Sequence, residues 1–155
     1  MALPTTLPSP VDDIPRIFNA GPFAYDTGSN VDLYELATDS SDSLVMMRST
    51  DGGLTFSEVD GANAPSETSV NSVAAVIDGT TIHMATVQNN ATADYKYHTF
   101  SLSGTPGWGT TDEAIASGVD TDIPQTSRLA IDIAVRSNGD VVVVYNGASD
   151  TIMTP

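Results

Sequence analysis

Three stretches of this chain share one outline, and this repeat constrains the fold more than any other feature of the sequence. Each stretch consists of an apolar run, a tight turn that contains glycine, and a second apolar run. The three stretches are AYDTGSNVDLYELA from Ala24, AVIDGTTIHMATV from Ala75 and AVRSNGDVVVVYNG from Ala134. Short apolar runs separated by turn residues are typical of β-strands, and no convincing amphipathic helix interrupts them. The sequence therefore predicts an all-β fold.

These runs predict ten strands. Several runs, such as SVAAVI and DVVVVY, are apolar at consecutive positions, which indicates strands that are covered on both faces. A half-exposed sheet would instead alternate apolar and polar residues. The predicted strands lie near residues 21–25, 32–37, 44–48, 55–59, 73–77, 81–87 and 95–102, around Trp108, and near residues 129–135 and 140–145.

The predicted strands recur at a regular spacing. Gly28 and Gly79 are 51 residues apart, Gly79 and Gly139 are 60 apart, and Phe56 and Trp108 are 52 apart. A four-stranded unit that repeats about every 50 residues is typical of a β-propeller, in which each blade is a four-stranded antiparallel sheet. The sequence therefore predicts propeller-like blades.

The chain supplies about two and a half such blades. A propeller closes with about four to eight blades, so we expect an incomplete propeller or one that other chains complete. An extended arm comes first, because its four prolines disfavour a helix. The predicted arm spans residues 1–15, and the blades span residues 16–155, approximately as units 16–60, 70–118 and a partial unit 126–155.

The most specific motif is STDGGLTF, which runs from Ser49 to Phe56. It resembles the Asp-box, S-x-D-x-G-x-T-[W/F], which is the bacterial neuraminidase repeat of sialidase-like propellers. Such propellers are found in glycosidases and in surface proteins of bacteria and bacteriophages. The corresponding stretch of the second unit, SLSGTPGWG, has no aspartate. The five defining residues in this chain are Ser49, Asp51, Gly53, Thr55 and Phe56.

The physical chemistry of this motif predicts a folding role. The carboxylate of Asp51 can accept backbone N–H bonds and tie a tight hairpin. Gly53 can adopt a positive φ, and Thr55 can bond across the turn. We expect Phe56 to fill the gap between its sheet and the neighbouring sheet. These residues are therefore predicted to be structural, with no catalytic residue among them.

The resemblance to sialidases implies a clamp of three arginines, a Tyr–Glu nucleophile pair and an aspartate acid/base. Arg16, in IPRIF, is a candidate clamp residue, although its proline precedes the arginine where the family has Arg-Ile-Pro. Arg48 and Arg136 are predicted to form salt bridges with the surplus carboxylates. Tyr34 and Glu35 are adjacent in a strand, so they should point to opposite faces. Later blades would have to supply the nucleophile pair.

The stretch YKYHTF offers a candidate ligand platform at Tyr95 and Tyr97. Aromatic faces stack on sugars, but packing between neighbouring blades accounts for these rings equally well. Both interpretations remain open from the sequence, with packing favoured.

No metal site and no cofactor are predicted. The chain has no cysteine, and His83 and His98 lie in predicted strands without the other ligands that zinc requires. We expect both histidines to be satisfied internally or to face solvent. Asp120 and Asp122, at alternate positions of GVDTDIP, leave Ca²⁺ as an alternative.

The charge balance limits the partners. The chain has 5 Lys and Arg against 20 Asp and Glu, a formal net charge of −15. Such a surface repels phosphate, so nucleic acid is not an expected partner. The N-terminal stretch lacks the basic and apolar regions that a signal peptide needs, and no run of 18 apolar residues occurs, so we expect neither a signal peptide nor membrane insertion.

Three functions are compatible with these features. The preferred hypothesis is a non-enzymatic structural or attachment component of a larger assembly, with other protein subunits as partners. The resemblance favours a virion or other extracellular particle surface as its location, with synthesis in the cytoplasm. The alternatives are a fragment of a sialidase-type glycoside hydrolase and a carbohydrate-binding module with a glycan ligand.

Overall fold

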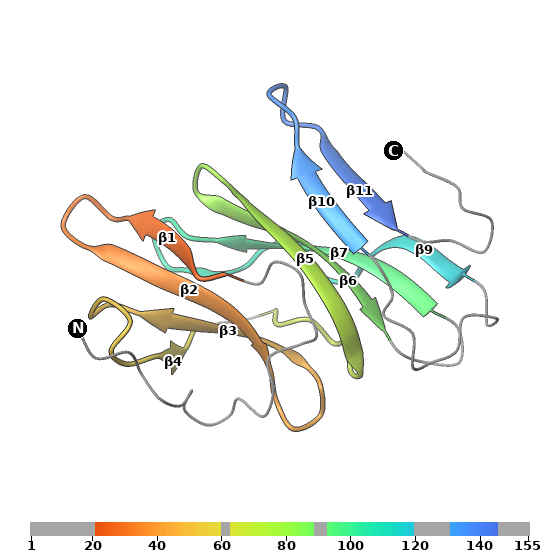
Figure 1. Cartoon of the computed structure of the whole chain (residues 1–155), viewed down its shortest axis with the longest axis horizontal. Coiled ribbons are helices and arrows are strands. Elements are labelled where there is room, and N and C mark those ends of the chain that lie inside the picture. Colours follow the sequence, from red (N-terminus) through yellow and green to blue (C-terminus); the bar gives the residue numbers. More distant parts are fainter. Residues whose placement is uncertain (1–20, 60–62, 89–92, 120–130, 146–155) are drawn as a thin grey trace.

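The computed structural model describes residues 21–59, 63–88, 93–119 and 131–145, and their regular structure consists of β-strands alone. The strands form three antiparallel sheets, which follow one another along the molecule (Figure 1). The predicted all-β fold is therefore confirmed.

Within each sheet, strands that are consecutive in the chain pair with one another, with one exception at β9. Sheet A contains β1 (Phe23–Asp26), β2 (Val31–Thr38), β3 (Leu44–Ser49) and β4 (Ser57–Glu58). Sheet B contains β5 (Val70–Asp78), β6 (Thr81–Gln88), β7 (Ala93–Ser101) and β8 (Gly107–Trp108), and β9 (Glu113–Val119) also pairs with β7. Sheet C contains β10 (Ile131–Val135) and β11 (Val141–Tyr145).

The first hairpin of each sheet is closed by a turn that contains a glycine. Gly28, Gly79 and Gly139 have φ values of 83°, 55° and 89°, a region that glycine occupies without steric cost. These are the three turns of the sequence repeat. The repeat therefore marks the β1–β2, β5–β6 and β10–β11 hairpins.

Aspartates tie several turns of sheet A. Asp26 accepts the backbone N–H of Gly28 at 2.7 Å. Asp39 accepts the N–H groups of Ser41 and Ser43 at 2.8 and 2.9 Å. Short side-chain carboxylates can satisfy turn N–H groups in this way, which explains part of the high aspartate content.

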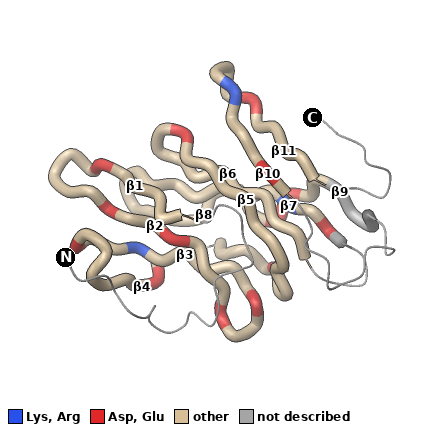
Figure 2. Tube along the Cα trace, viewed as in Figure 1, with Lys and Arg blue, Asp and Glu red and all other residues tan. Residues whose placement is uncertain are grey.

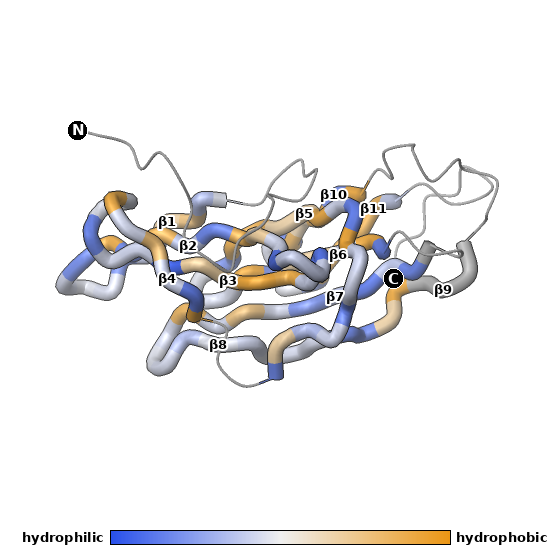
Figure 3. The backbone as a smooth tube through the Cα atoms, turned by 90° about the horizontal axis from the view of Figure 1, so that it is seen from below, coloured by the Kyte–Doolittle hydropathy of each residue, from blue (hydrophilic) through white to orange (hydrophobic). Residues whose placement is uncertain are grey.

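The sheets stack through apolar faces, and hydrophobic stretches of the trace lie in the strands that supply these faces (Figure 3). Because successive strand residues point to opposite faces, each central strand contributes to two layers. The larger core joins sheets A and B through Phe23, Tyr34, Leu36, Leu44, Met46, Val70, Val73, Ala75, Ile82, Met84, Phe100, Leu102 and Trp108. The second core joins the other face of sheet B to sheet C through Ala74, Ala85, Val87, Tyr95, Ile131, Ile133 and Val143.

The linker between sheets A and B is held from both sides. At the sheet A side, the N–H of Val70 donates to the carbonyl of Asp42 at 3.1 Å. At the sheet B side, the N–H and the hydroxyl of Ser66 donate to Asp112 at 2.9 and 2.8 Å. Asp42, Ser69 and Asp112 all have positive φ although none is glycine, which indicates that these contacts fix the local backbone.

Candidate functional site: a buried glutamate–histidine–aspartate cluster

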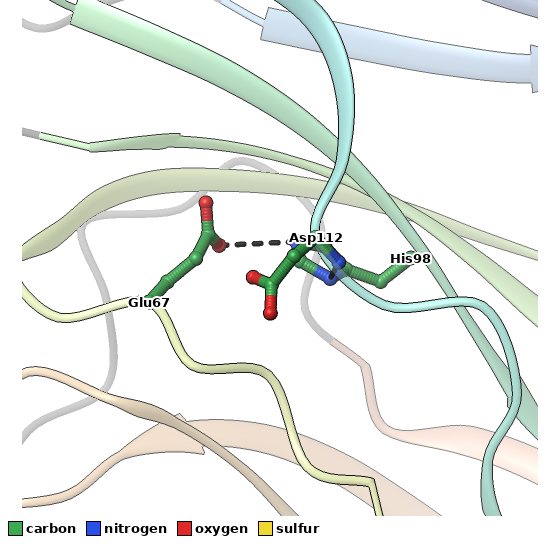
Figure 4. Close-up of side chains that lie close together, drawn as sticks. All are labelled: Glu67, His98 and Asp112. Atoms are coloured by element: carbon green, nitrogen blue, oxygen red, sulfur yellow. Dashed lines mark hydrogen bonds and ion pairs between the residues drawn. The ribbon is translucent and has the colours of Figure 1, made fainter.

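One group of described side chains brings acidic and histidine residues from distant parts of the chain close together (Figure 4). His98 and Lys96 lie two residues apart on β7, so they share the face that is turned toward sheet A. Thr86 lies opposite Lys96 on β6. Glu67 comes from the linker before β5, and Asp112 follows β8. We call Glu67, Thr86, Lys96, His98 and Asp112 the polar cluster.

Short hydrogen bonds connect its centre. The hydroxyl of Thr86 donates to Oε2 of Glu67 at 2.7 Å, and Nε2 of His98 lies 3.0 Å from the same oxygen. The backbone N–H of Asp112 donates to Nδ1 of His98 at 3.1 Å. Glu67 and His98 are fully buried. The two ring nitrogens of His98 are therefore bonded to two different segments, the linker before β5 and the segment after β8.

These contacts fix the tautomer of His98. Nδ1 accepts a backbone N–H and so cannot carry a proton of its own. The proton of a neutral imidazole must then sit on Nε2, from which it points at the carboxylate of Glu67. The geometry therefore favours a neutral Nε2–H histidine whose tautomer is set by the backbone of Asp112.

Asp112 is held as a carboxylate. Burial by itself would raise its pKa, but the N–H and hydroxyl of Ser66 and the nearby Lys96 outweigh that effect and lower the pKa below its ordinary value. Nζ of Lys96 lies 3.4 Å from Asp112 and 3.7 Å from Oε1 of Glu67. The lysine therefore places one positive charge between two acids.

The cluster does not fit a metal ion, although Glu67, His98 and Asp112 offer ligand atoms within 4.8 Å of one another. A histidine that binds a metal through Nε2 normally donates its Nδ1–H to another group. Here Nδ1 is an acceptor, and the ammonium of Lys96 already compensates the carboxylates. The arrangement is that of a structural network that attaches the linker to sheet B.

Sequence reasoning missed the neighbours of His98. Glu67 lies 31 residues before it and Asp112 lies 14 residues after it, and neither stands in a recognisable motif. His83 has a simpler partner, since its Nδ1 lies 2.6 Å from the hydroxyl of Tyr97. Both histidines are thus satisfied internally, one of the two outcomes expected for them.

The hairpin between β3 and β4 is tied by the side chains of the predicted motif. One oxygen of Asp51 accepts the N–H groups of Leu54 and Thr55 at 3.0 and 2.9 Å, and the other accepts the Thr55 hydroxyl at 2.6 Å. Ser49 donates to Asp51 and accepts the N–H of Gly53. Gly53 has a φ of 87°. The bonds that Thr55, Ser49 and Leu54 donate to Asp51 lower its pKa to about 2.

Phe56 packs on the face of sheet A that is turned away from sheet B. Its neighbours there are Ala37, Val45 and Met47. The sequence predicts that this ring lies between its sheet and a neighbouring sheet. Among the described strands, however, it contacts sheet A alone. Trp108, at the corresponding place in the second unit, does lie between two sheets.

The candidate ligand-binding residues Tyr95 and Tyr97 differ in how far their rings are buried. Tyr95 is fully buried, and its ring lies 4.4 Å from that of Tyr145 in the core between sheets B and C. Packing between the sheets therefore accounts for this ring, as the favoured interpretation of the sequence expected. Tyr97 is partly buried and stacks on His83 at 6.1 Å.

Arg48 is engaged in an internal ion pair. Its Nε and Nη2 donate to one oxygen of buried Asp32 at 2.9 and 2.6 Å, and its guanidinium lies over the ring of Tyr34. Tyr34 is buried between the sheets, while adjacent Glu35 points to the opposite face, as alternation along a strand requires. Arg16, Asp120 and Asp122 lie outside the described residues.

Acidic residues are spread over the described trace, and only Arg48, Lys96 and Arg136 are basic there (Figure 2). No helix that is long and apolar enough to cross a membrane occurs in the described ranges. Comparison of the chain with protein-family models, with curated proteins and with solved structures finds no match.

Proposed function

We propose that this chain is a non-enzymatic structural or attachment component of a larger assembly, built from sialidase-like propeller blades. Two features support the blade interpretation. The first four strands of sheets A and B pair in chain order, and the sheets pack face to face. The carboxylate of Asp51 ties the hairpin between the third and fourth strands of sheet A, as an Asp-box would.

The state of sheet C carries the proposal. Among the described strands, β2 and β6 pair on both edges, whereas β11 pairs with β10 alone. The outer face of this two-stranded sheet exposes Val144, which is 43% accessible. Two-stranded sheets are marginal by themselves, and free strand edges accept further strands. Sheet C is therefore suited to continuation by additional β-structure from a partner subunit or from the same chain.

The surface of a bacteriophage or other virion is the setting we propose. The resemblance to propellers of such surfaces suggests it, and the net charge of −15 favours a soluble outer surface over contact with nucleic acid. Other subunits of the particle would be the partners.

Intact mass measured under denaturing and native conditions tests the proposal. We expect the 155-residue chain, of 16.1 kDa, to form a native assembly of larger mass. Val144→Lys should reduce that assembly, because a charge on the outer face of sheet C opposes stacking. Val31→Lys is the matched control, since Val31 is similarly exposed, at 48%, but lies in sheet A. A chain that stays monomeric at every concentration would rule the assembly role out.

Carbohydrate binding is the second candidate, and the partly exposed Tyr97–His83 pair favours it. Glycan-array binding that Tyr97→Ala abolishes, with the fold intact, would support this candidate. Hydrolysis of a sialoside by the chain alone would instead favour the sialidase alternative.

A further inference from the structure

Lys96 and Asp112 bring a primary amine and a carboxyl group together inside the polar cluster. Nζ of Lys96 lies 3.4 Å from Oδ1 of Asp112, and the two side chains are only 21% and 25% exposed. Lys96 lies within β7, and Asp112 lies between β8 and β9, which both pair with β7. Strand pairing on either side of Asp112 therefore holds the two groups together, in addition to their ion pair.

The two carboxyl oxygens of Asp112 have different partners. Oδ2 accepts the backbone N–H and the hydroxyl of Ser66 at 2.9 and 2.8 Å. Oδ1 accepts from Nζ of Lys96. Two donors on one oxygen form the arrangement of an oxyanion hole, which stabilises the negative charge of a tetrahedral intermediate. The donors of Ser66 therefore favour addition of a nucleophile to Cγ of Asp112.

Glu67 places a second carboxyl group beside the same amine. Its Oε2 is bonded to the hydroxyl of Thr86 and to Nε2 of His98. Its Oε1 is buried, accepts no hydrogen bond from the described residues and lies 3.7 Å from Nζ of Lys96. Buried carboxylate oxygens normally have a hydrogen-bond partner, so this oxygen points to a role in proton transfer.

We propose that Lys96 and Asp112 form an intramolecular isopeptide bond, with Glu67 transferring the protons. The reaction starts from the ammonium–carboxylate pair. Oε1 of Glu67 removes a proton from the ammonium, and the neutral amine forms a bond to Cγ of Asp112. The Cγ–Oδ1 bond then breaks, and Oδ1 leaves as water with two of the three ammonium protons. Oδ2 becomes the amide oxygen, held by Ser66. One cation and one anion are consumed, so no oxidant, reductant or activating group is needed.

The positions of the groups make this condensation feasible. Nζ has to move only from Oδ1 to the adjoining Cγ, which rotation of the flexible lysine stem allows. Groups that a scaffold holds at the reacting distance reach effective molarities of about 10⁵–10⁸ M. Because both side chains are partly exposed, the released water has a path to solvent.

The bond gives a chain without cysteine a covalent cross-link. It closes the stretch from Lys96 to Asp112, so the β7–β8 hairpin stays connected even when its hydrogen bonds open. A cross-link stabilises the fold by restricting the unfolded chain, as a disulfide does. This property goes beyond the proposed assembly role and does not depend on it.

Tryptic digestion of the denatured full-length chain, followed by mass spectrometry, tests the bond. Lys96 is the sole lysine, and the nearest arginines in the sequence are Arg48 and Arg128. Trypsin does not cleave after an acylated lysine. We therefore expect one peptide of residues 49–128 that is lighter than its sequence by one water. A free Lys96 would give two peptides, 49–96 and 97–128, of unchanged mass.

Three variants assign the roles. Lys96→Arg keeps the positive charge but removes the amine, so its intact mass should equal the mass of its sequence. Glu67→Gln should slow bond formation about hundredfold, so the freshly purified variant should retain a free Lys96. Glu113→Gln is the matched control, because Glu113 is an exposed glutamate next to Asp112, and it should form the bond like the unmodified protein. Unchanged emission of Trp108 shows that the variants are folded.

Three results would overturn the proposal or the role of Glu67. The first is unmodified protein in which trypsin still cleaves after Lys96 following long incubation at neutral pH. This result decides the bond by itself, even where a variant fails to fold. The second is a loss of water that persists in Lys96→Arg, which would place the change elsewhere, as in a succinimide at Asp51–Gly52. The third is a bond that forms at the full rate in Glu67→Gln, which would exclude Glu67 as the proton-transfer group.

Discussion

The β3–β4 and β7–β8 hairpins occupy the same position in sheets A and B, but different interactions hold them. In sheet A the turn is tied by polar bonds that converge on Asp51, and the aromatic residue that follows, Phe56, is only partly buried. In sheet B there is no aspartate, and Trp108 is 5% exposed between two sheets, with its ring 5.3 Å from that of Phe100. In the hairpin that lacks the aspartate, a buried aromatic side chain thus provides the attachment.

The comparison also explains why the motif of the second unit is incomplete. The N–H of Leu102 in the second hairpin donates to the carbonyl of Thr80, and its side chain is buried in the larger core. This hairpin is therefore attached to the body of the protein by a backbone hydrogen bond and by buried apolar side chains. The first hairpin has an exposed Leu54 at its tip and depends on bonds within its own turn.

The largest expected effect comes from removing the two aromatic anchors. Trp108→Ala should lower the free energy of unfolding by about 4 kcal/mol, because it empties a buried site between two sheets. Phe56→Ala should cost about half as much, since its ring is partly exposed. Urea denaturation followed by circular dichroism measures both. Equal losses would show that Phe56 is packed as tightly on sheet A as Trp108 is between the two sheets.

The polar cluster gives sheet B a second anchor that the hairpin of sheet A lacks. We expect His98→Ala to cost about 3 kcal/mol, because it removes one of the bonds to buried Glu67, leaves the N–H of Asp112 without its partner and opens a cavity. His83→Ala, on the other face of the same sheet, is the control and should cost about 1 kcal/mol. Comparable losses would mean that the cluster does not anchor the linker. NMR of ¹⁵N-labelled protein should show Nε2 of His98 protonated and Nδ1 unprotonated, and the reverse pattern would contradict the tautomer.

Glycine substitutions sharpen the comparison of the turns themselves. Gly53→Ala and Gly104→Ala each place a side chain at a positive φ, which costs about 1 kcal/mol. The Cβ at position 53 would also lie 3.3 Å from Cδ1 of Leu33, whereas position 104 has open space. Gly53→Ala should therefore be the more destabilising of the two in the same denaturation assay. The opposite order would mean that the first turn can relax away from Leu33.

The smallest effect is a pH response confined to the first hairpin. Hydrogen bonds from Thr55 and Ser49 lower the pKa of Asp51 from 3.8 to about 2, so the ionised form is favoured in the folded state. The stabilisation is complete above the ordinary pKa and is lost as the pH falls through about 2. NMR titration of the carboxyl should give that midpoint, and Thr55→Val should raise it. A midpoint near 3.8 in the unmodified protein would show that the bonds do not favour the carboxylate.

The strands could be predicted because local patterns determine them. Each of the ten predicted strands overlaps an observed one, since apolar runs define most of them and a glycine turn lies at one end of most of them. The sequence does not predict β9. Its residues, EAIASGV, include several small ones with weak β-propensity. It forms by pairing with β7 alongside β8, and that contact is not encoded in its own residues.

The polar cluster could not be predicted, because its members come together only when the linker packs on sheet B. Glu67 stands among turn-forming residues in the sequence, and nothing there indicates that its side chain is buried. The burial of Tyr95 could not be predicted from the sequence either. Its place in an aromatic strand was compatible with a ligand platform, and only the position of sheet C shows that the ring is enclosed.

The pairing of consecutive strands has a consequence for how this protein is made. Every strand from β1 to β8 finds a partner within its own sheet among its immediate neighbours in the chain, so each loop that must close is short. Sheet A can therefore complete its strand pairing on the ribosome before the residues of sheet B have been synthesised. The linker that carries Glu67 then joins the finished sheet to the growing one, which places its attachment late in the order of folding.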